Sequence, residues 1–107
     1  ERIYDVAWSG DRKPDNEGRL PPVGNTVSLE TGRYENSIGA VELTTVWTDP
    51  DFDPTLRALY YVRVIQIPTP RHTLLDTIAL QQPPEAAGGH ASSIQERAYS
   101  SPIWYTP

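Results

Sequence analysis

The feature that most constrains the fold is the run of residues 57–68, the longest stretch of β-type composition in the chain. It is dense in Tyr, Val and Ile, and Pro54 and Pro68 bound it. Eleven prolines and seven glycines restrict the rest of the chain to short strands and many turns. We therefore predict that residues 57–68 form the central strand of a small β domain.

The alternation of this central run breaks at Val64 and Ile65, so that both faces are apolar apart from Arg63 and Gln66. Such a pattern indicates either a strand that is covered on both sides or a bulge near Val64 and Ile65. We favour two-sided cover, because a domain this small can place the strand between a sheet partner and something docked outside.

Length, charge and composition exclude several classes of protein. A chain of 107 residues is expected to form one domain. The net charge is −5, and one Lys and eight scattered Arg do not make a phosphate-binding surface, so we expect no nucleic-acid partner. No apolar run reaches the ~20 residues of a transmembrane helix, and we expect no membrane insertion. Without cysteine there are no disulfides or thiolate metal sites.

The chain starts at Glu1 and contains no methionine. We therefore expect a fragment of a larger protein, made either by removal of a leader or by excision, from which any targeting signal has been lost.

Further strands are predicted from alternating apolar and polar residues. They lie at residues 2–9, 26–29, 33–37 and 40–48, and again from residue 94 to residues 103–105. A turn at Thr31 and Gly32 would join the second and third of them as a hairpin. Five to seven short strands are typical of an antiparallel sandwich.

Residues 68–93 interrupt the β pattern and form an insertion before the last strand. Thr73 and Asp76 have the spacing of a capping box. A one-sided apolar stripe then predicts about two helical turns: Leu74, Leu75, Ile78 and Ala79. Residues 81–93 contain two Pro and two Gly and are predicted to be a mobile loop.

Asp49, Asp51 and Asp53 have the spacing of a calcium loop, but the Gly and the distant Glu of the full motif are missing. We interpret them as an acidic turn and keep calcium as a weak candidate. The two histidines, His72 and His90, do not form a zinc-ligand pair, and we expect both on the surface. No cofactor and no catalytic residue is predicted in this chain.

Arg63 lies among apolar residues of the central run, where an unpaired Arg is uncommon. We expect a salt bridge to Glu42 or Glu96, with contact to a neighbouring domain as the functional alternative. The three tryptophans, Trp8, Trp47 and Trp104, are predicted to lie in the core, and a sugar-stacking platform is the alternative.

Four blocks of sequence resemble the C-terminal end of the bacterial domain-of-unknown-function 3604 family. These blocks are residues 45–54, 60–64, 67–71 and 94–105, and the similarity covers nearly the whole chain. The family resemblance implies a longer, often exported parent whose main domain looks like a PHP-type metallohydrolase. It also implies that this chain is the immunoglobulin-like tail of that protein. None of the metal-binding clusters of those relatives matches a position here.

We therefore expect a mainly β protein, a small antiparallel immunoglobulin-like sandwich with one short helix in the insertion, that forms a single domain over residues 1–107. The expected function is that of a non-catalytic tail which packs against the catalytic domain of a metal-dependent hydrolase, in the periplasm or outside the cell. Thr69, Arg71 and His72 are the candidates for one wall of its cleft. The alternatives are a carbohydrate- or calcium-binding module and a purely structural or dimerising domain. The sequence leaves the oligomeric state open.

Overall fold

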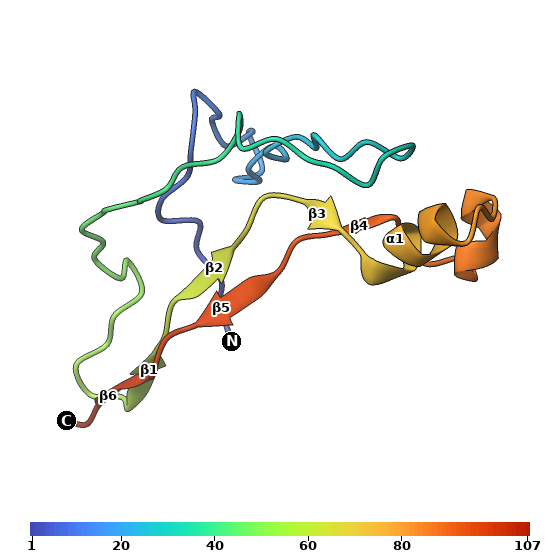
Figure 1. Ribbon diagram of the computed structural model, residues 1–107. Helices are drawn as coiled ribbons and strands as arrows, with labels where there is room; N and C mark the ends of the chain where they lie inside the picture. The colour runs from blue at the N-terminus through green and yellow to red at the C-terminus, as the bar shows by residue number, and fades with distance from the viewer.

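The computed structural model describes the backbone of residues 1–107 and every side chain except that of Pro84 (Figure 1). Its regular elements are six short strands, one α-helix and one 3-10 helix, all within residues 58–105. They are β1 (Ala58–Tyr60), β2 (Arg63–Ile65), β3 (Thr69–Pro70), α1 (His72–Ala79), η1 (Pro84–Ala87), β4 (Ser93–Ile94), β5 (Arg97–Tyr99) and β6 (Ile103–Tyr105). The prediction of a mainly β protein with one short α-helix is confirmed.

The strands pair as three antiparallel ladders, β1 with β6, β2 with β5 and β3 with β4. The ladders follow one another along a single two-armed ribbon, which ends at α1 (Figure 1). We call β1, β2, β5 and β6 together the β ribbon. Each sheet has only two strands, so the structure does not confirm an immunoglobulin-like sandwich.

A bulge separates the first two ladders. Tyr60 lies opposite Ile103, whereas Arg63 lies opposite Tyr99, so three steps along one arm match four along the other. The extra residue lies within residues 100–102. An added residue moves the following side chains of its own arm to the other face of the strand. This bulge lies on the arm opposite the central run, so it does not account for the broken alternation at Val64 and Ile65.

A second bulge lies on the opposite arm. Ile65 pairs with Arg97 and Thr69 pairs with Ile94, so the extra residue lies within residues 66–68. A bulge was one of the two explanations for the sequence pattern, but both bulges lie outside Val64 and Ile65, where it was expected.

Within the structure described, this chain does not itself provide the two-sided cover that we favour for the central run, and cover by something docked outside stays a prediction. Val62 and Val64 are each 55% exposed, and Ile65 is 50% exposed. The predicted central strand is also divided, because the bulges and Pro68 separate β1, β2 and β3.

Helix α1 occupies the predicted position, and Leu74 is its buried apolar contact, only 2% exposed. The capping box is wrong, because Arg71 is the N-cap residue and Thr73 already lies inside the helix. Arg71 is extended, with φ −72° and ψ 151°, and no side chain caps the helix. Among the described residues, no helix has the length and apolar character needed to cross a membrane.

Residues 26–35 form an irregular hairpin that packs on α1. The N–H of Ser28 donates to the C=O of Arg33 at 2.8 Å, and Gly32 at the turn is buried against Leu75. The predicted turn at Thr31 and Gly32 is therefore present, although the flanking residues form no ladder.

The strands predicted at residues 2–9, 26–29, 33–37 and 40–48 do not form, since residues 1–57 contain no strand in the structure described. Alternation favours an extended backbone, but a strand also needs a ladder of hydrogen bonds to a neighbour. In the structure described, the segments 26–29 and 33–37 share the single backbone bond from Ser28 to Arg33, and no ladder forms. The predicted loop at residues 81–93 contains η1 and ends at Ser93, the first residue of β4.

The chain does not enclose a core of its own. Leu74 is the only fully buried apolar side chain among those described. The radius of gyration is 18.3 Å, against about 13 Å for a compact chain of this length. The accessible surface is 8803 Å², whereas a compact monomer of 12 kDa exposes about 6,000 Å².

Candidate functional site

A group of aromatic and acidic side chains joins segments from both halves of the chain. The rings of Tyr4 and Trp47 lie 5.0 Å apart and tilted, and those of Trp47 and Tyr60 lie 6.4 Å apart in an edge-to-face arrangement. We call these three residues the aromatic cluster. They hold the N-terminal segment, the segment before the acidic turn and β1 together.

Two carboxylates of the acidic turn accept hydrogen bonds from the tyrosines of the aromatic cluster and from Arg2. Asp51 accepts hydrogen bonds from the Arg2 guanidinium and the Tyr4 hydroxyl. The Tyr60 hydroxyl donates to Oδ2 of Asp49 at 2.7 Å. The sequence did not point to Tyr4 and Tyr60 as partners, because Tyr4 lies 47 residues from Asp51 and Tyr60 lies 11 residues from Asp49, beyond the reach of a local turn pattern.

Asp53, unlike Asp49 and Asp51, makes all of its described hydrogen bonds within the turn itself. Its Oδ1 accepts from the backbone N–H of Thr55 at 2.8 Å and from the Thr55 hydroxyl at 2.7 Å, as in an ordinary turn. Among the described residues, no three His, Asp or Glu side chains are arranged to hold a metal ion. The three carboxylates therefore act as turn and hydrogen-bond acceptors, and the geometry gives calcium no support.

These contacts shift the pKa of several groups. The hydrogen bond from Tyr4, followed by the one from Arg2, lowers the pKa of Asp51. The same bond to Asp51 raises the pKa of Tyr4, and the bond to Asp49 raises the pKa of Tyr60. Each shift favours the protonation state that makes the hydrogen bond, which is the ionised form of Asp51 and the protonated form of Tyr4 and Tyr60. These hydrogen bonds are therefore all present near neutral pH, and are lost first in acid at Asp51 and in alkali at the tyrosines.

The tryptophans do not form the predicted core. Trp104 is 73% exposed, Trp47 is 40% exposed and Trp8 is half-buried. They do not form a stacking platform either, because the described aromatic contacts of Trp47 are with tyrosines and no two tryptophans pair.

The salt bridge predicted for Arg63 is wrong. Arg63 is exposed, and none of the ion pairs between described side chains involves it. Its neighbours on the ribbon are aromatic, since Arg63 lies opposite Tyr99, whose ring is 6.0 Å from that of Tyr61.

The candidates for a cleft wall lie where β3 leads into α1. Thr69 pairs with Ile94, and the N–H of the half-buried Arg71 donates to the C=O of Ser92 at 2.9 Å. His72 is exposed as the first residue of α1. The three residues lie within four positions of the chain, but none of them lines either of the two cavities described below.

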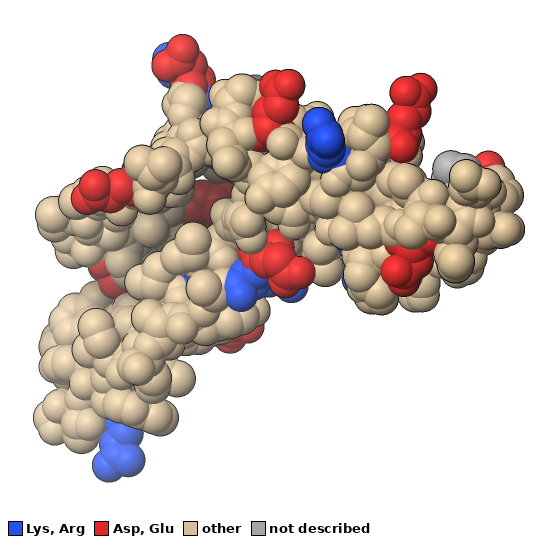
Figure 2. Space-filling model, viewed as in Figure 1, with Lys and Arg blue, Asp and Glu red and all other residues tan. Residues whose placement is uncertain are grey.

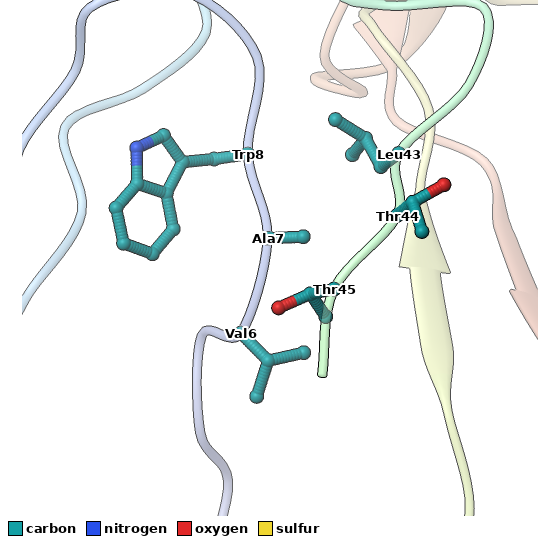
Figure 3. A pocket seen from close by; sticks show the side chains of 6 residues that line it. All are labelled: Val6, Ala7, Trp8, Leu43, Thr44 and Thr45. Carbon is teal, nitrogen blue, oxygen red and sulfur yellow. The ribbon is translucent and has the colours of Figure 1, made fainter. Parts of the chain in front are cut away.

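Two open cavities lie elsewhere. One, of about 380 Å³, lies between α1 and η1 and is lined by Asp76 and His90 among others. The other, of about 240 Å³, lies between residues 6–8 and residues 43–45 (Figure 3). In Figure 3, the side chains of Val6 and Ala7 point toward the segment with Leu43 and Thr45, whereas the ring of Trp8 points away from that segment. Both cavities are open hollows, and among the described side chains neither holds a group of three His, Asp or Glu residues placed to bind a metal ion.

Among the comparisons with known proteins, one gives a match. No curated protein and no solved structure matches the chain. A family model described as a protein of unknown function (DUF3604) matches residues 1–107. The chain therefore belongs to the DUF3604 family.

Proposed function

We propose that this chain is a non-catalytic β element that docks through its apolar surface onto a larger protein body. The observation that carries the proposal is its surface, which at 8803 Å² exceeds that of a compact monomer by about 2,800 Å². One side of a large obligate interface buries about 1,000–2,500 Å², so the excess is large enough to supply such an interface.

The exposed apolar side chains of the β ribbon indicate where docking occurs. Ile103 is 71% exposed, Trp104 is 73% exposed and Val62 is 55% exposed. Figure 2 shows that the arm carrying β1 and β6 is almost free of charged side chains on the face in view. A two-stranded ribbon is marginal in water, so cover by another protein layer would also stabilise it.

We identify the larger body with the catalytic domain of a metal-dependent hydrolase, which would be the rest of the same polypeptide, exported from the cytoplasm. The support for this step is the resemblance to PHP-type metallohydrolase tails. The carboxylates of the acidic turn are consistent with a supporting role, because Asp49 and Asp51 already bind Tyr60, Tyr4 and Arg2.

A charged substitution on the ribbon tests the docking. In this chain alone Ile103→Lys is a surface change, expected to alter the stability by less than about 0.5 kcal/mol. In the complete gene product it would bury an unpaired charge, and the melting temperature is expected to fall by several degrees or more. Leu80→Lys is the matched control, since Leu80 is 69% exposed and lies outside the ribbon. Equal melting temperatures for wild type and Ile103→Lys would overturn the proposal.

Thr69, Arg71 and His72 remain our candidates for a wall of the hydrolase cleft. They lie together at the junction of β3 and α1, and the guanidinium of Arg71 is suited to an anionic substrate group. Arg71→Ala, compared with Arg71→Lys, should lower the turnover of a phosphate-ester substrate by the complete gene product. Unchanged turnover and affinity in both variants would remove Arg71 from the site.

A further inference from the structure

Residues 42–47, which we call the free segment, have the composition of a strand but no strand partner. All six residues are exposed, and Val46 is 97% exposed. None of their backbone N–H or C=O groups makes a hydrogen bond in the structure described. Their φ angles are all negative, since Gln81 is the one described non-glycine residue with a positive φ. The backbone is therefore compatible with a strand whose hydrogen-bonding groups are unused.

One face of the free segment packs against N-terminal residues of this chain. Figure 3 shows Leu43 and Thr45 on the side of Val6 and Ala7, and the ring of Trp47 packs on Tyr4 at 5.0 Å. These contacts fix the orientation of the segment.

The opposite face carries Glu42, Thr44 and Val46, all of them exposed. Since both backbone edges also lack partners, the free segment is oriented but unpaired.

We propose that the free segment adds, as an extra strand, to the edge of a β-sheet in the partner body; this inference rests on the proposed function. Six residues span about 20 Å, which is the length of a typical strand. Strand addition would satisfy the unused backbone groups along one edge, and main-chain hydrogen bonds would supply the affinity.

Charge indicates what kind of sheet edge receives the free segment. Residues 1–56 contain eleven acidic and five basic residues, whereas residues 57–107 contain three acidic and four basic residues. The free segment itself carries Glu42 and no basic residue. Exposed edge strands often carry Lys, so the fitting partner is an edge with a Lys or Arg opposite Glu42. A second copy of this segment fits less well, because two acidic strands would repel each other.

Hydrogen exchange with residue resolution, measured on the complete gene product, tests the inference. Strand addition predicts that alternate amides of residues 42–47 exchange at least about tenfold more slowly than in an unstructured peptide. Exchange at the unprotected rate throughout residues 42–47 would overturn it. If Ile103→Lys destabilises the same protein while these amides remain unprotected, docking stands and strand addition fails. If Ile103→Lys has no effect, the proposed function fails as well.

Proline substitutions give a second, independent readout. Successive N–H groups of a strand point to opposite edges. Thr44→Pro and Thr45→Pro should therefore differ: the variant that removes the bonded N–H should lose the protection of the flanking amides, and the other should retain most of it. Thr44→Val and Thr45→Val are the matched controls, which keep the N–H and favour strands. Protection that survives both proline substitutions would contradict strand addition.

Glu42 tests the charge of the receiving edge. Glu42→Lys should reduce the protection of residues 42–47 more than Glu42→Gln does. Equal protection in both variants would show that the edge is not basic.

Discussion

Gly32 lies directly against Leu75 of α1. A β-carbon at Gly32 would stand 2.5 Å from Cδ2 of Leu75 and 3.3 Å from Cδ1 of Ile78. Gly32 also has φ +64°, which side-chain-bearing residues rarely adopt. This contact joins the irregular hairpin of residues 26–35 to the helix, so that the turn and α1 depend on each other.

Gly32→Ala is expected to lower the free energy of unfolding by about 1–3 kcal/mol, because it adds both a steric overlap and backbone strain. Gly18→Ala separates the two causes, since Gly18 has φ +78° and nothing within 4 Å of the added carbon. That control should cost only about 1 kcal/mol. Urea unfolding of both variants in the complete gene product measures the difference, and equal losses would contradict a steric contribution from Leu75 and Ile78.

Leu74→Ala is expected to destabilise the protein by about 2–3 kcal/mol, because it leaves a cavity at the one fully buried apolar side chain of those described. Leu80→Ala is the matched control, with the same chemical change at a residue that is 69% exposed. It should cost less than about 0.5 kcal/mol. Thermal unfolding checks both values, and a Leu74→Ala protein as stable as Leu80→Ala would show that α1 is not anchored by Leu74.

Asp51→Asn should change how stability depends on acid pH. The folded pKa of Asp51 is lowered by Tyr4 and Arg2, so its stabilising contribution is present above the unfolded pKa and is lost as the pH falls through the folded pKa. The wild type should thus be more stable than Asp51→Asn at neutral pH. The two should converge below about pH 4. Urea midpoints between pH 2 and 7 measure this, and a constant gap over the whole range would contradict the assignment.

Tyr60→Phe should remove a loss of stability at alkaline pH. The bond to Asp49 raises the folded pKa of Tyr60, so its contribution is present below the unfolded pKa and disappears as the pH rises through the folded pKa. The wild type should lose its advantage over Tyr60→Phe above about pH 10. Tyr34→Phe serves as the control, because the Tyr34 hydroxyl makes no hydrogen bond to a described residue, and its stability should follow that of the wild type.

The parts of the fold that depend on local sequence were predictable. The stripe of Leu74 and its neighbours predicts α1, and the run of Tyr, Val and Ile at residues 57–68 predicts one arm of the ribbon. The position of the bulges was not predictable, because it depends on the register between two distant arms.

The N-terminal strands were wrong for a related reason. Alternation at residues 2–9 and 40–48 indicates which side chains share a face, but it does not supply a hydrogen-bonding neighbour. Likewise, the spacing of Asp49, Asp51 and Asp53 indicated an acidic turn, with calcium as a weak candidate, but it did not indicate that Asp51 binds Tyr4, which lies 47 residues away. In each case the missing information was a contact between remote segments.

The solvent accessibility of Trp104 in the complete gene product tests the central claim, that the β ribbon is a docking surface. Hydroxyl-radical footprinting compares the oxidation rate of Trp104 in the native protein with its rate after unfolding in urea. The docking proposal predicts that oxidation in the native state is slowed at least about fivefold, because burial excludes the radical from the indole. A native rate close to the unfolded one, as expected for a side chain that stays 73% exposed, would contradict the claim.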